Sequence, residues 1–256
     1  MARSRLLKTL GLSSIDPSDQ FLRDLSTTIE KVQDNRKPSQ TFKPSSMGSC
    51  KRNIYYQLTG VEPDSNVEDA SMIGICDSGI DTHERIQTYI SKMASCGFDC
   101  IWVDVDEFVK TSGKSLPSTT VKRKCGMETK LYDSKYNMSF LCDGVVKYRG
   151  EYYIIEIKTE MSRKFGTHDA PFSHHIEQAT CYSLCLGIDK VIFLYINRDV
   201  HVMKTYLVDI TDRLKQKVID EIEEVNHYVT NGTLPPKETT KCAYCRYRST
   251  CRRERE

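Results

Sequence analysis

The chain has 256 residues, of which 28% are charged and 39% hydrophobic, and its formal net charge is +2 at pH 7. This length suits one domain of about 200 residues with appendages. The low net charge excludes a histone-like or polyanionic protein, so binding of nucleic acid would depend on local basic patches. No stretch approaches the roughly 18 apolar residues that a membrane span needs, and Lys8 interrupts an N-terminal apolar run too short for a secretory signal. We therefore expect a cytoplasmic protein.

The hydrophobic pattern predicts a mixed α/β chain. One amphipathic helix begins near Asp16-Pro17, and further along the chain helical patterns alternate with runs of period two, which are typical of strands. The other predicted helices are 45–58, 68–94, 171–186 and 211–228, and the predicted strands are 98–105, 125–133, 138–148, 151–159, 191–197 and 203–210, with loops over 110–122 and 161–170. This order favours a mixed sheet with helices on its faces.

The densest signal is a predicted hairpin over residues 138–159, MSFLCDGVVKYRGEYYIIEIKT. Arg149-Gly150 lies between two β-rich runs, and glycine tolerates the positive φ that tight hairpin turns require. A turn centred between these two residues places Asp143 opposite Glu156. Because opposed residues share a face of the sheet, and alternation adds Lys158 to that face, two carboxylates and an amine are expected side by side.

Two opposed carboxylates in an otherwise apolar hairpin repel each other, and one would stay protonated unless a cation lay between them. Carboxylate oxygens with open positions suit Mg²⁺ or Mn²⁺, and a metal so held can activate a water molecule for attack on a phosphate. Lys158 could neutralise the charge that develops on the phosphate or orient the water. The alternative interpretation is a surface Glu–Lys pair on a solvated edge, and a turn of odd length would break the register.

Two further motifs flank this hairpin. Gly79-Ile80-Asp81-Thr82-His83 precedes it, and Gln178-Ala179-Thr180-Cys181-Tyr182 follows it. Together with Asp143 and Glu156-Ile157-Lys158, they resemble the PD-(D/E)XK nucleases of the RecB type, and the resemblance covers residues 44–251. It implies a restriction-endonuclease-like α/β fold with an α-β-β-β-α-β core, and a metal-dependent nuclease activity.

The resemblance also implies roles for individual residues. His83, Asp143 and Glu156 would bind the metal together with the main-chain carbonyl of Ile157, and Lys158 would be catalytic. Gln178 and Tyr182 share one helix face and would bind substrate phosphate or hold the lysine. His174 would be a DNA contact, and Glu128 would be an additional acid near the metal. By themselves, a lone histidine is more often structural and a Gln–Tyr pair an ordinary polar helix face.

Eleven cysteines are many for a cytoplasmic chain, in which disulfides are rare. Cys242, Cys245 and Cys251 lie in a segment too short to form its own core, so a bound ion or cluster is expected there. Cys50 is the best candidate for a fourth ligand. One upstream cysteine and three near the C-terminus resemble the iron–sulfur branch of RecB-like nucleases, which includes CRISPR-associated exonucleases, and this resemblance implies a [4Fe-4S] cluster. Spacing alone leaves a structural Zn²⁺ open.

Basic and aromatic residues gather around these cysteines. Such a mixture suits contact with phosphates and stacking on bases, although a solvated tail is the simpler interpretation of the last four residues. The candidates for DNA contact in this part of the chain are Lys51, Arg52, Tyr55, Arg246 and Arg248.

We therefore expect a metal-dependent deoxyribonuclease, an exonuclease that acts on single-stranded DNA or DNA ends in recombination, repair or spacer acquisition. Its domains would be an N-terminal helical arm (1–40), a nuclease domain (41–233) and a cysteine-rich cluster segment (234–256). DNA is the expected partner, together with helicase, recombination or CRISPR adaptation proteins, in a prokaryotic cell or a phage-infected host. The alternative from another class is a non-catalytic DNA-binding protein whose iron–sulfur or zinc site is structural or senses redox state.

Overall fold

The computed structural model describes residues 16–32, 38–64, 69–112, 118–238, 240, 242 and 245–254. Parts of the predicted N-terminal arm (1–15 and 33–37) and of the predicted cluster segment (239, 241, 243–244 and 255–256) lie outside the described residues. The chain divides into two compact units, one formed by Met1–Arg36 with Ser65–Ser78 and the other by Lys37–Asp64 with Gly79–Glu256.

The smaller unit contains helix α2 (Pro17–Lys31) and the first part of helix α4 (Ala70–Ser91). Helix α2 begins where the sequence predicts it. The Asp16 side chain accepts a hydrogen bond from Ser18 N at 2.8 Å, and Pro17 occupies the first turn, where no main-chain donor is needed.

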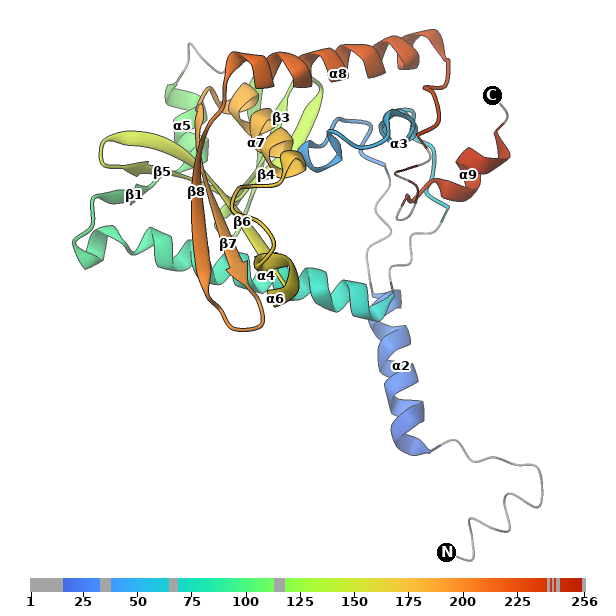
Figure 1. The fold of residues 1–256 in the computed structure, drawn as a ribbon, viewed down its shortest axis with the longest axis horizontal. Helices are drawn as coiled ribbons and strands as arrows, with labels where there is room; N and C mark the ends of the chain where they lie inside the picture. The colour runs from blue at the N-terminus through green and yellow to red at the C-terminus, as the bar shows by residue number, and fades with distance from the viewer. Residues whose placement is uncertain are drawn as a thin grey trace, which may run out of the picture. The chain divides into compact units, whose positions relative to one another are not determined.

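The larger unit is built on a five-stranded sheet with the strand order β1-β5-β6-β7-β8 (Figure 1). Strands β6 and β7 run parallel, and the other neighbouring pairs are antiparallel, so the sheet is mixed, as predicted. The strands are β1 (Cys100–Trp102), β5 (Gly144–Tyr148), β6 (Glu151–Glu160), β7 (Lys190–Asn197) and β8 (Met203–Asp209).

Helices cover both faces of this sheet. Helices α7 (Ser173–Leu186) and α8 (Asp212–Asn231) pack on one face, and the second part of α4 packs on the other. Alternation along β6 places Ile154 with Val218 of α8 in the first core and Ile155 with Ile86 of α4 in the second. None of the helices formed by the described residues has the length and apolar character that crossing a bilayer requires.

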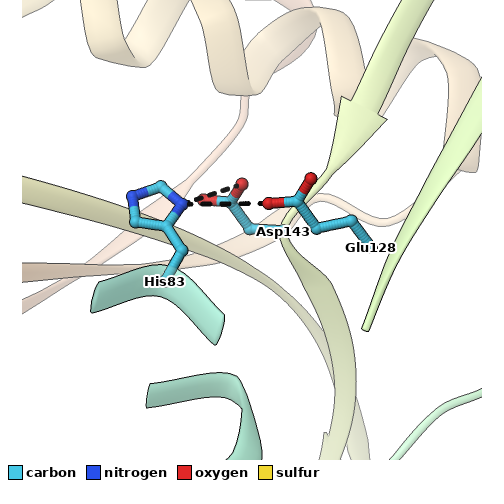
Figure 2. Close-up of side chains that lie close together, drawn as sticks. All are labelled: His83, Glu128 and Asp143. Atoms are coloured by element: carbon cyan, nitrogen blue, oxygen red, sulfur yellow. Dashed lines mark ion pairs between the residues drawn. The ribbon is translucent and has the colours of Figure 1, made fainter. Parts of the chain in front are cut away.

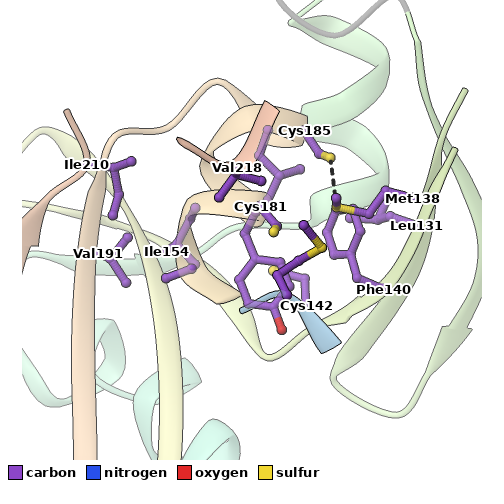
Figure 3. Packing of buried hydrophobic residues seen from close by; sticks show 14 of the residues in the cluster. Leu131, Met138, Phe140, Cys142, Ile154, Cys181, Cys185, Val191, Ile210 and Val218 are labelled. Carbon is purple, nitrogen blue, oxygen red and sulfur yellow. Dashed lines mark hydrogen bonds between the residues drawn. The ribbon is translucent and has the colours of Figure 1, made fainter. Parts of the chain in front are cut away.

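A second sheet of three antiparallel strands completes the first core. Its strands are β2 (Thr119–Cys125), β3 (Glu128–Asp133) and β4 (Met138–Cys142). Figure 3 shows Leu131 of β3 and Phe140 of β4 beside the α7 thiols Cys181 and Cys185, all of them buried. This sheet therefore packs on the helix that carries the Gln–Tyr motif.

Four segments differ from the sequence predictions. The predicted loop 110–122 contains the end of helix α5 (Val105–Thr111), which Asp104 caps by accepting from two main-chain N–H groups, and the start of β2. The predicted strand 138–148 is interrupted at Asp143, so that β4 and β5 belong to different sheets. Short helices absent from the prediction occupy Ser162–Phe165 (α6) and Arg248–Arg253 (α9). The remaining elements are α3 (Lys51–Leu58) and the 3₁₀ turns η1 (Pro44–Ser46) and η2 (Ala94–Cys96).

The β5–β6 hairpin has the predicted register. Gly144 pairs with Ile155, and the turn residues Arg149 and Gly150 have φ values of 50° and 84°, the two positive values of a type I′ turn. The even-length turn therefore places Asp143, directly before β5, opposite Glu156.

Gly144 allows the Trp102 indole to approach the main chain beside Asp143. A Cβ atom at position 144 would lie 2.2 Å from the nearest ring carbon. We expect Gly144→Ala to lower the free energy of unfolding by about 1–3 kcal/mol, because the indole must move out of a packed site. Urea denaturation measures this change, with Gly166→Ala as control, since a Cβ there would lie 3.6 Å from the nearest atom. Equal losses in the two variants would contradict the expectation.

Candidate active site

His83, Glu128 and Asp143 come together from three elements, as Figure 2 shows. His83 lies on α4, Glu128 begins β3, and Asp143 joins β4 to β5. His83 Nδ1 lies 3.6 Å from Asp143 Oδ1 and 4.0 Å from Glu128 Oε1. In each residue, one nitrogen or oxygen atom that could bind a metal lies within 4.8 Å of the corresponding atoms of the other two. Among the described residues, no other group of three or more His, Cys, Asp or Glu side chains is this compact. One imidazole nitrogen and two carboxylate oxygens suit a divalent cation.

The interruption of the strand fixes Asp143 from two sides. Its Oδ2 accepts a hydrogen bond from Ile157 N at 2.8 Å, and its main-chain carbonyl accepts one from Gln87 Nε2 at 2.8 Å. Gln87 is fully buried and lies one turn beyond His83 on α4. The second carboxylate oxygen, Oδ1, is thereby left directed toward the histidine.

A chain of polar contacts begins at Glu156. Its Oε1 lies 2.5 Å from Lys158 Nζ, Lys158 donates to Gln178 Oε1 at 3.0 Å, and Gln178 Nε2 donates to Tyr182 OH at 2.6 Å. The first two residues share a face of β6, and the last two share a face of α7. The structure thus brings these four sequence-predicted residues into contact, with Gln178 holding the lysine amine.

Burial and crowded negative charge dominate the electrostatics. Glu156 is 1% exposed, and its Oε2 has no hydrogen-bond partner within the described part of the chain. Burial, followed by the charge of Asp143, raises the pKa of Glu156 to about 7 despite Lys158. The same two causes raise the pKa of Glu128. Burial lowers the pKa of His83, but the interaction with Asp143 and the neighbouring carboxylates outweighs burial and raises it.

This donor set fits a divalent cation. Several carboxylates compete for few protons, and a bound cation would relieve their repulsion. The buried Glu156 Oε2 offers a further oxygen that has no partner among the described residues. The sequence predicted that the metal-binding side chains are His83, Asp143 and Glu156. In the structure the acid that lies with His83 and Asp143 is Glu128, which was expected only as an additional acid.

The predicted DNA contacts lie in two places. His174 is exposed on α7, stacked on Phe172 with 5.7 Å between ring centroids. The others lie on α3 and near α9, where Arg246 and Arg248 are exposed.

Two of the α3 residues contact protein groups instead. Arg52 is 3% exposed and donates to Pro235 O at 2.8 Å, a position that argues against its predicted contact with DNA. Lys51 Nζ lies 2.6 Å from Glu224. Tyr55 is half-buried, edge-on to Tyr56 at 5.9 Å between centroids.

The four cysteines predicted to bind a cluster line one cavity of about 330 Å³. Cys50 directly precedes α3, and the others come from the C-terminal segment. Burial raises the pKa of the Cys245 thiol, and Cys50, Cys242 and Cys251 raise it further. Residues separated by about 200 positions therefore line the same cavity.

On α7, the helix that carries Gln178 and Tyr182, His175 is a buried, neutral base. Its Nδ1 lies 2.7 Å from Tyr195 OH, and burial, followed by the charge of Lys158, lowers the pKa of His175 to about 2. In the unfolded chain His175 takes up a proton near pH 6.5, whereas in the folded protein it stays neutral at that pH. The free energy of unfolding therefore falls as the pH decreases below 6.5.

We expect His175→Asn to lose less stability than the wild type between pH 6.5 and about pH 4.5, because asparagine does not titrate there. Its amide oxygen can accept from Tyr195 in place of Nδ1. Urea denaturation across this range measures the difference. His227→Asn, on the exposed part of α8, should keep the wild-type pH dependence, and identical profiles for both variants would contradict the assignment.

Fold and site together define an α/β domain in which a compact group of side chains that could bind a metal lies beside a buried Glu–Lys pair. The family model of the PD-(D/E)XK nuclease superfamily matches residues 124–252, slightly more than half of the chain. The chain therefore belongs to the PD-(D/E)XK nuclease superfamily and is a nuclease with its restriction-endonuclease-like fold. Nucleases of this superfamily use divalent metals, in agreement with the ligand group.

Several solved structures are similar to this chain, among them SSO0001 and two structures of LHK-Exo. SSO0001 is 16% identical, with a TM-score of 0.50 over 91% of this chain and 96% of its own. The alkaline exonuclease LHK-Exo from Laribacter hongkongensis is 13% identical, with a TM-score of 0.43 over 76% of this chain and 90% of its own. LHK-Exo in complex with dAMP is 13% identical, with a TM-score of 0.42 over 75% and 89%. The likeness to SSO0001 concerns the fold alone. Among curated proteins, no sequence matches the chain.

Proposed function

We propose that this nuclease hydrolyses phosphodiester bonds of DNA with Mg²⁺ or Mn²⁺. The observation that carries the proposal is the meeting of His83, Glu128 and Asp143 beside the buried Glu156–Lys158 pair. A divalent cation bound there supplies a polarised water molecule and compensates charge on the phosphate. A cation site next to a held amine is the combination that phosphodiester hydrolysis requires.

The protein's own residues divide into ligands and positioning groups. His83, Glu128 and Asp143 would hold the cation, Glu156 would add its unpartnered Oε2, and the Ile157 carbonyl is the remaining predicted ligand. Lys158 would then act on the substrate, its ammonium contacting a phosphate oxygen or the attacking water. Gln178 would hold that ammonium in place, and Tyr182 would hold Gln178.

We further propose an exonuclease of the RecB type that acts on single-stranded DNA or DNA ends, in recombination, repair or spacer acquisition. The support is the resemblance of the ordered motifs around His83, Asp143 and Tyr182 to that group. The helicase, recombination or CRISPR partners remain predictions that rest on the same resemblance. The division into 1–40, 41–233 and 234–256 and the cytoplasmic location remain predictions from the sequence pattern.

End-labelled linear DNA and circular single-stranded DNA test the activity. The anaerobically purified protein should shorten linear strands from their ends with Mg²⁺ or Mn²⁺, leave circles intact, and do neither in EDTA. Cleavage of circles would contradict the exonuclease assignment. Binding of DNA without cleavage under either metal would overturn the nuclease assignment in favour of the non-catalytic alternative.

We also propose a [4Fe-4S] cluster bound by Cys50, Cys242, Cys245 and Cys251. The shared cavity supports a common ligand. Four thiolates on one Zn²⁺, each about 2.3 Å from the metal, would lie roughly 3.8 Å apart. No three of these described thiols form a group within 4.8 Å. In a [4Fe-4S] cluster each thiolate binds a different iron, so the four thiols need not lie as close together as around one Zn²⁺.

A further inference from the structure

A second cavity, of about 580 Å³, lies at the end of β6. It begins one residue beyond Lys158, and its walls come from the end of β6, from α6 with the following turn, and from the residue after β7. The lining residues are Thr159, Glu160, Met161, Arg163, Lys164, Thr167 and Arg198. Three of the seven are basic and one is acidic.

The single acid in this lining is compensated within the protein. Glu160 is 3% exposed, with Oε2 2.9 Å from His168 Nε2 and Oε1 3.0 Å from Lys164 Nζ. Arg163 is exposed and forms no ion pair within the described part of the chain, and Arg198 reaches an acid, Asp199, only at 4.0 Å. Two guanidinium groups are therefore available to an external anion.

The wall of the cavity is held in place by hydrogen bonds. Lys204 Nζ donates to the carbonyl oxygens of Phe165 at 2.5 Å and His168 at 2.8 Å. At the start of the segment, Ser162 N donates to the Asp199 carboxylate at 2.7 Å. Because these bonds fix the turn that carries the basic residues, little ordering would be needed when an anion binds.

Aromatic side chains adjoin Lys164 of this cavity. Lys164 Nζ lies 4.5 Å from the centre of the Phe172 ring, on which the exposed His174 stacks. Burial and then the charges of Lys164 and Lys158 lower the pKa of His174, so the fields of both lysines act on this imidazole. Basic groups interleaved with rings suit a nucleic-acid strand, which offers phosphates and bases in turn.

We propose that this cavity binds a phosphate group of the substrate strand close to the bond that is cleaved. The inference rests on the proposed function for the identity of the substrate. Thr159 and Glu160 lie one and two residues beyond Lys158, so the cavity begins roughly 3–7 Å farther along β6. The ligand is a phosphate anion, either internal to the strand or at its end.

Binding to a labelled single-stranded oligonucleotide in EDTA tests this site without cleavage. We expect Arg163→Ala and Arg198→Ala each to weaken binding about fivefold. Each change should make the slope of log affinity against log salt less negative by about 0.7, as loss of one contact with a single strand predicts. Arg213→Ala, an exposed arginine on α8, is the control. A double variant with wild-type affinity and slope, or a wild type that does not bind, would overturn the proposal.

Two further comparisons separate the phosphate sources and the two proposals. If only oligonucleotides with a phosphorylated end lose affinity in the arginine variants, the ligand is the terminal phosphate, whereas equal losses with hydroxyl ends identify an internal one. Weakened binding by these variants with no metal-dependent cleavage by the wild type would leave this site standing and refute the proposed function. Metal-dependent cleavage by the wild type, with DNA binding unchanged in the arginine variants, would refute this site and leave the proposed function standing.

Discussion

Asp143→Asn should abolish metal-dependent cleavage, by at least about a thousandfold, while the protein remains folded. Asparagine is nearly isosteric with aspartate, and its amide oxygen can still accept the hydrogen bond from Ile157 N. What it loses is the negative charge directed toward His83. Because removal of that charge also relieves the repulsion of Glu128 and Glu156, the metal-free variant should be at least as stable as the wild type.

A second variant separates metal binding from catalysis. A bound cation stabilises the folded state according to its concentration relative to its dissociation constant, so Mn²⁺ should raise the melting temperature of the wild type. Asp143→Asn should lose both this rise and cleavage. Lys158→Ala should lose cleavage and keep the rise, since its ammonium is not a ligand.

Asp209→Asn, exposed at the end of β8, is the matched control and should keep both properties. Wild-type cleavage by Asp143→Asn would contradict the assigned site. An unchanged Mn²⁺ effect in that variant would show that the cation binds elsewhere.

Local signals were sufficient to predict the β5–β6 hairpin. A two-residue turn with glycine determines the register of the strands that it joins, so the position of Asp143 opposite Glu156 follows from the turn alone. The contact between Lys158 and Glu156 then follows from alternation along a single strand. The sequence was therefore sufficient to predict how Asp143, Glu156 and Lys158 lie relative to one another, because all three belong to one hairpin.

The break at Asp143 could not be predicted in the same way. The run 138–148 is rich in apolar residues, and its only break signal is the Asp143-Gly144 dipeptide, a turn signal that lies where the chain leaves one sheet for the other. The break depends on tertiary contacts: Trp102 from β1 fills the space beside Gly144, and Gln87 from α4 donates a hydrogen bond to the Asp143 carbonyl. The approach of Glu128 depends on the same change of sheet, which explains why it was expected only as an additional acid.

Helix α5 shows a signal that was present but missed. Asp104 is a good cap, acidic residues follow it in the first turn, and Lys110 lies four residues after Asp106 and forms an ion pair with it. The run of apolar residues from Phe98 outweighed these cues. Conversely, Arg52 was predicted to contact DNA from composition alone, and only the fold shows that it is buried against Pro235.

Cys50→Ser should lose the cluster and destabilise the protein, although serine is by itself the better residue at this position. Cys50 is the N-cap of α3 and makes no side-chain capping bond. Serine is among the preferred N-cap residues, worth about 0.5–2 kcal/mol over a residue that cannot cap. If Cys50 binds nothing, the substitution should therefore be neutral or stabilising.

If Cys50 is a cluster ligand, the same substitution removes the ligand that would join α3 to the C-terminal segment. Metal–thiolate bonding in small sites contributes a large share of folding free energy. A loss of several kcal/mol would lower the melting temperature by more than about 10 °C in a domain of this size. The opposite signs of the two expectations make the experiment decisive.

The measurement is made on protein purified without oxygen: absorbance near 400 nm, iron and zinc content, and melting temperature. The wild type should be brown and contain iron, and Cys50→Ser should lose colour, iron and thermal stability together. Cys96→Ser, an exposed thiol outside the cavity, should lose none of them. A colourless wild type with stoichiometric zinc would replace the cluster by a Zn²⁺ site, and a Cys50→Ser protein that retains its iron and melts no lower than the wild type would remove Cys50 from the ligand set.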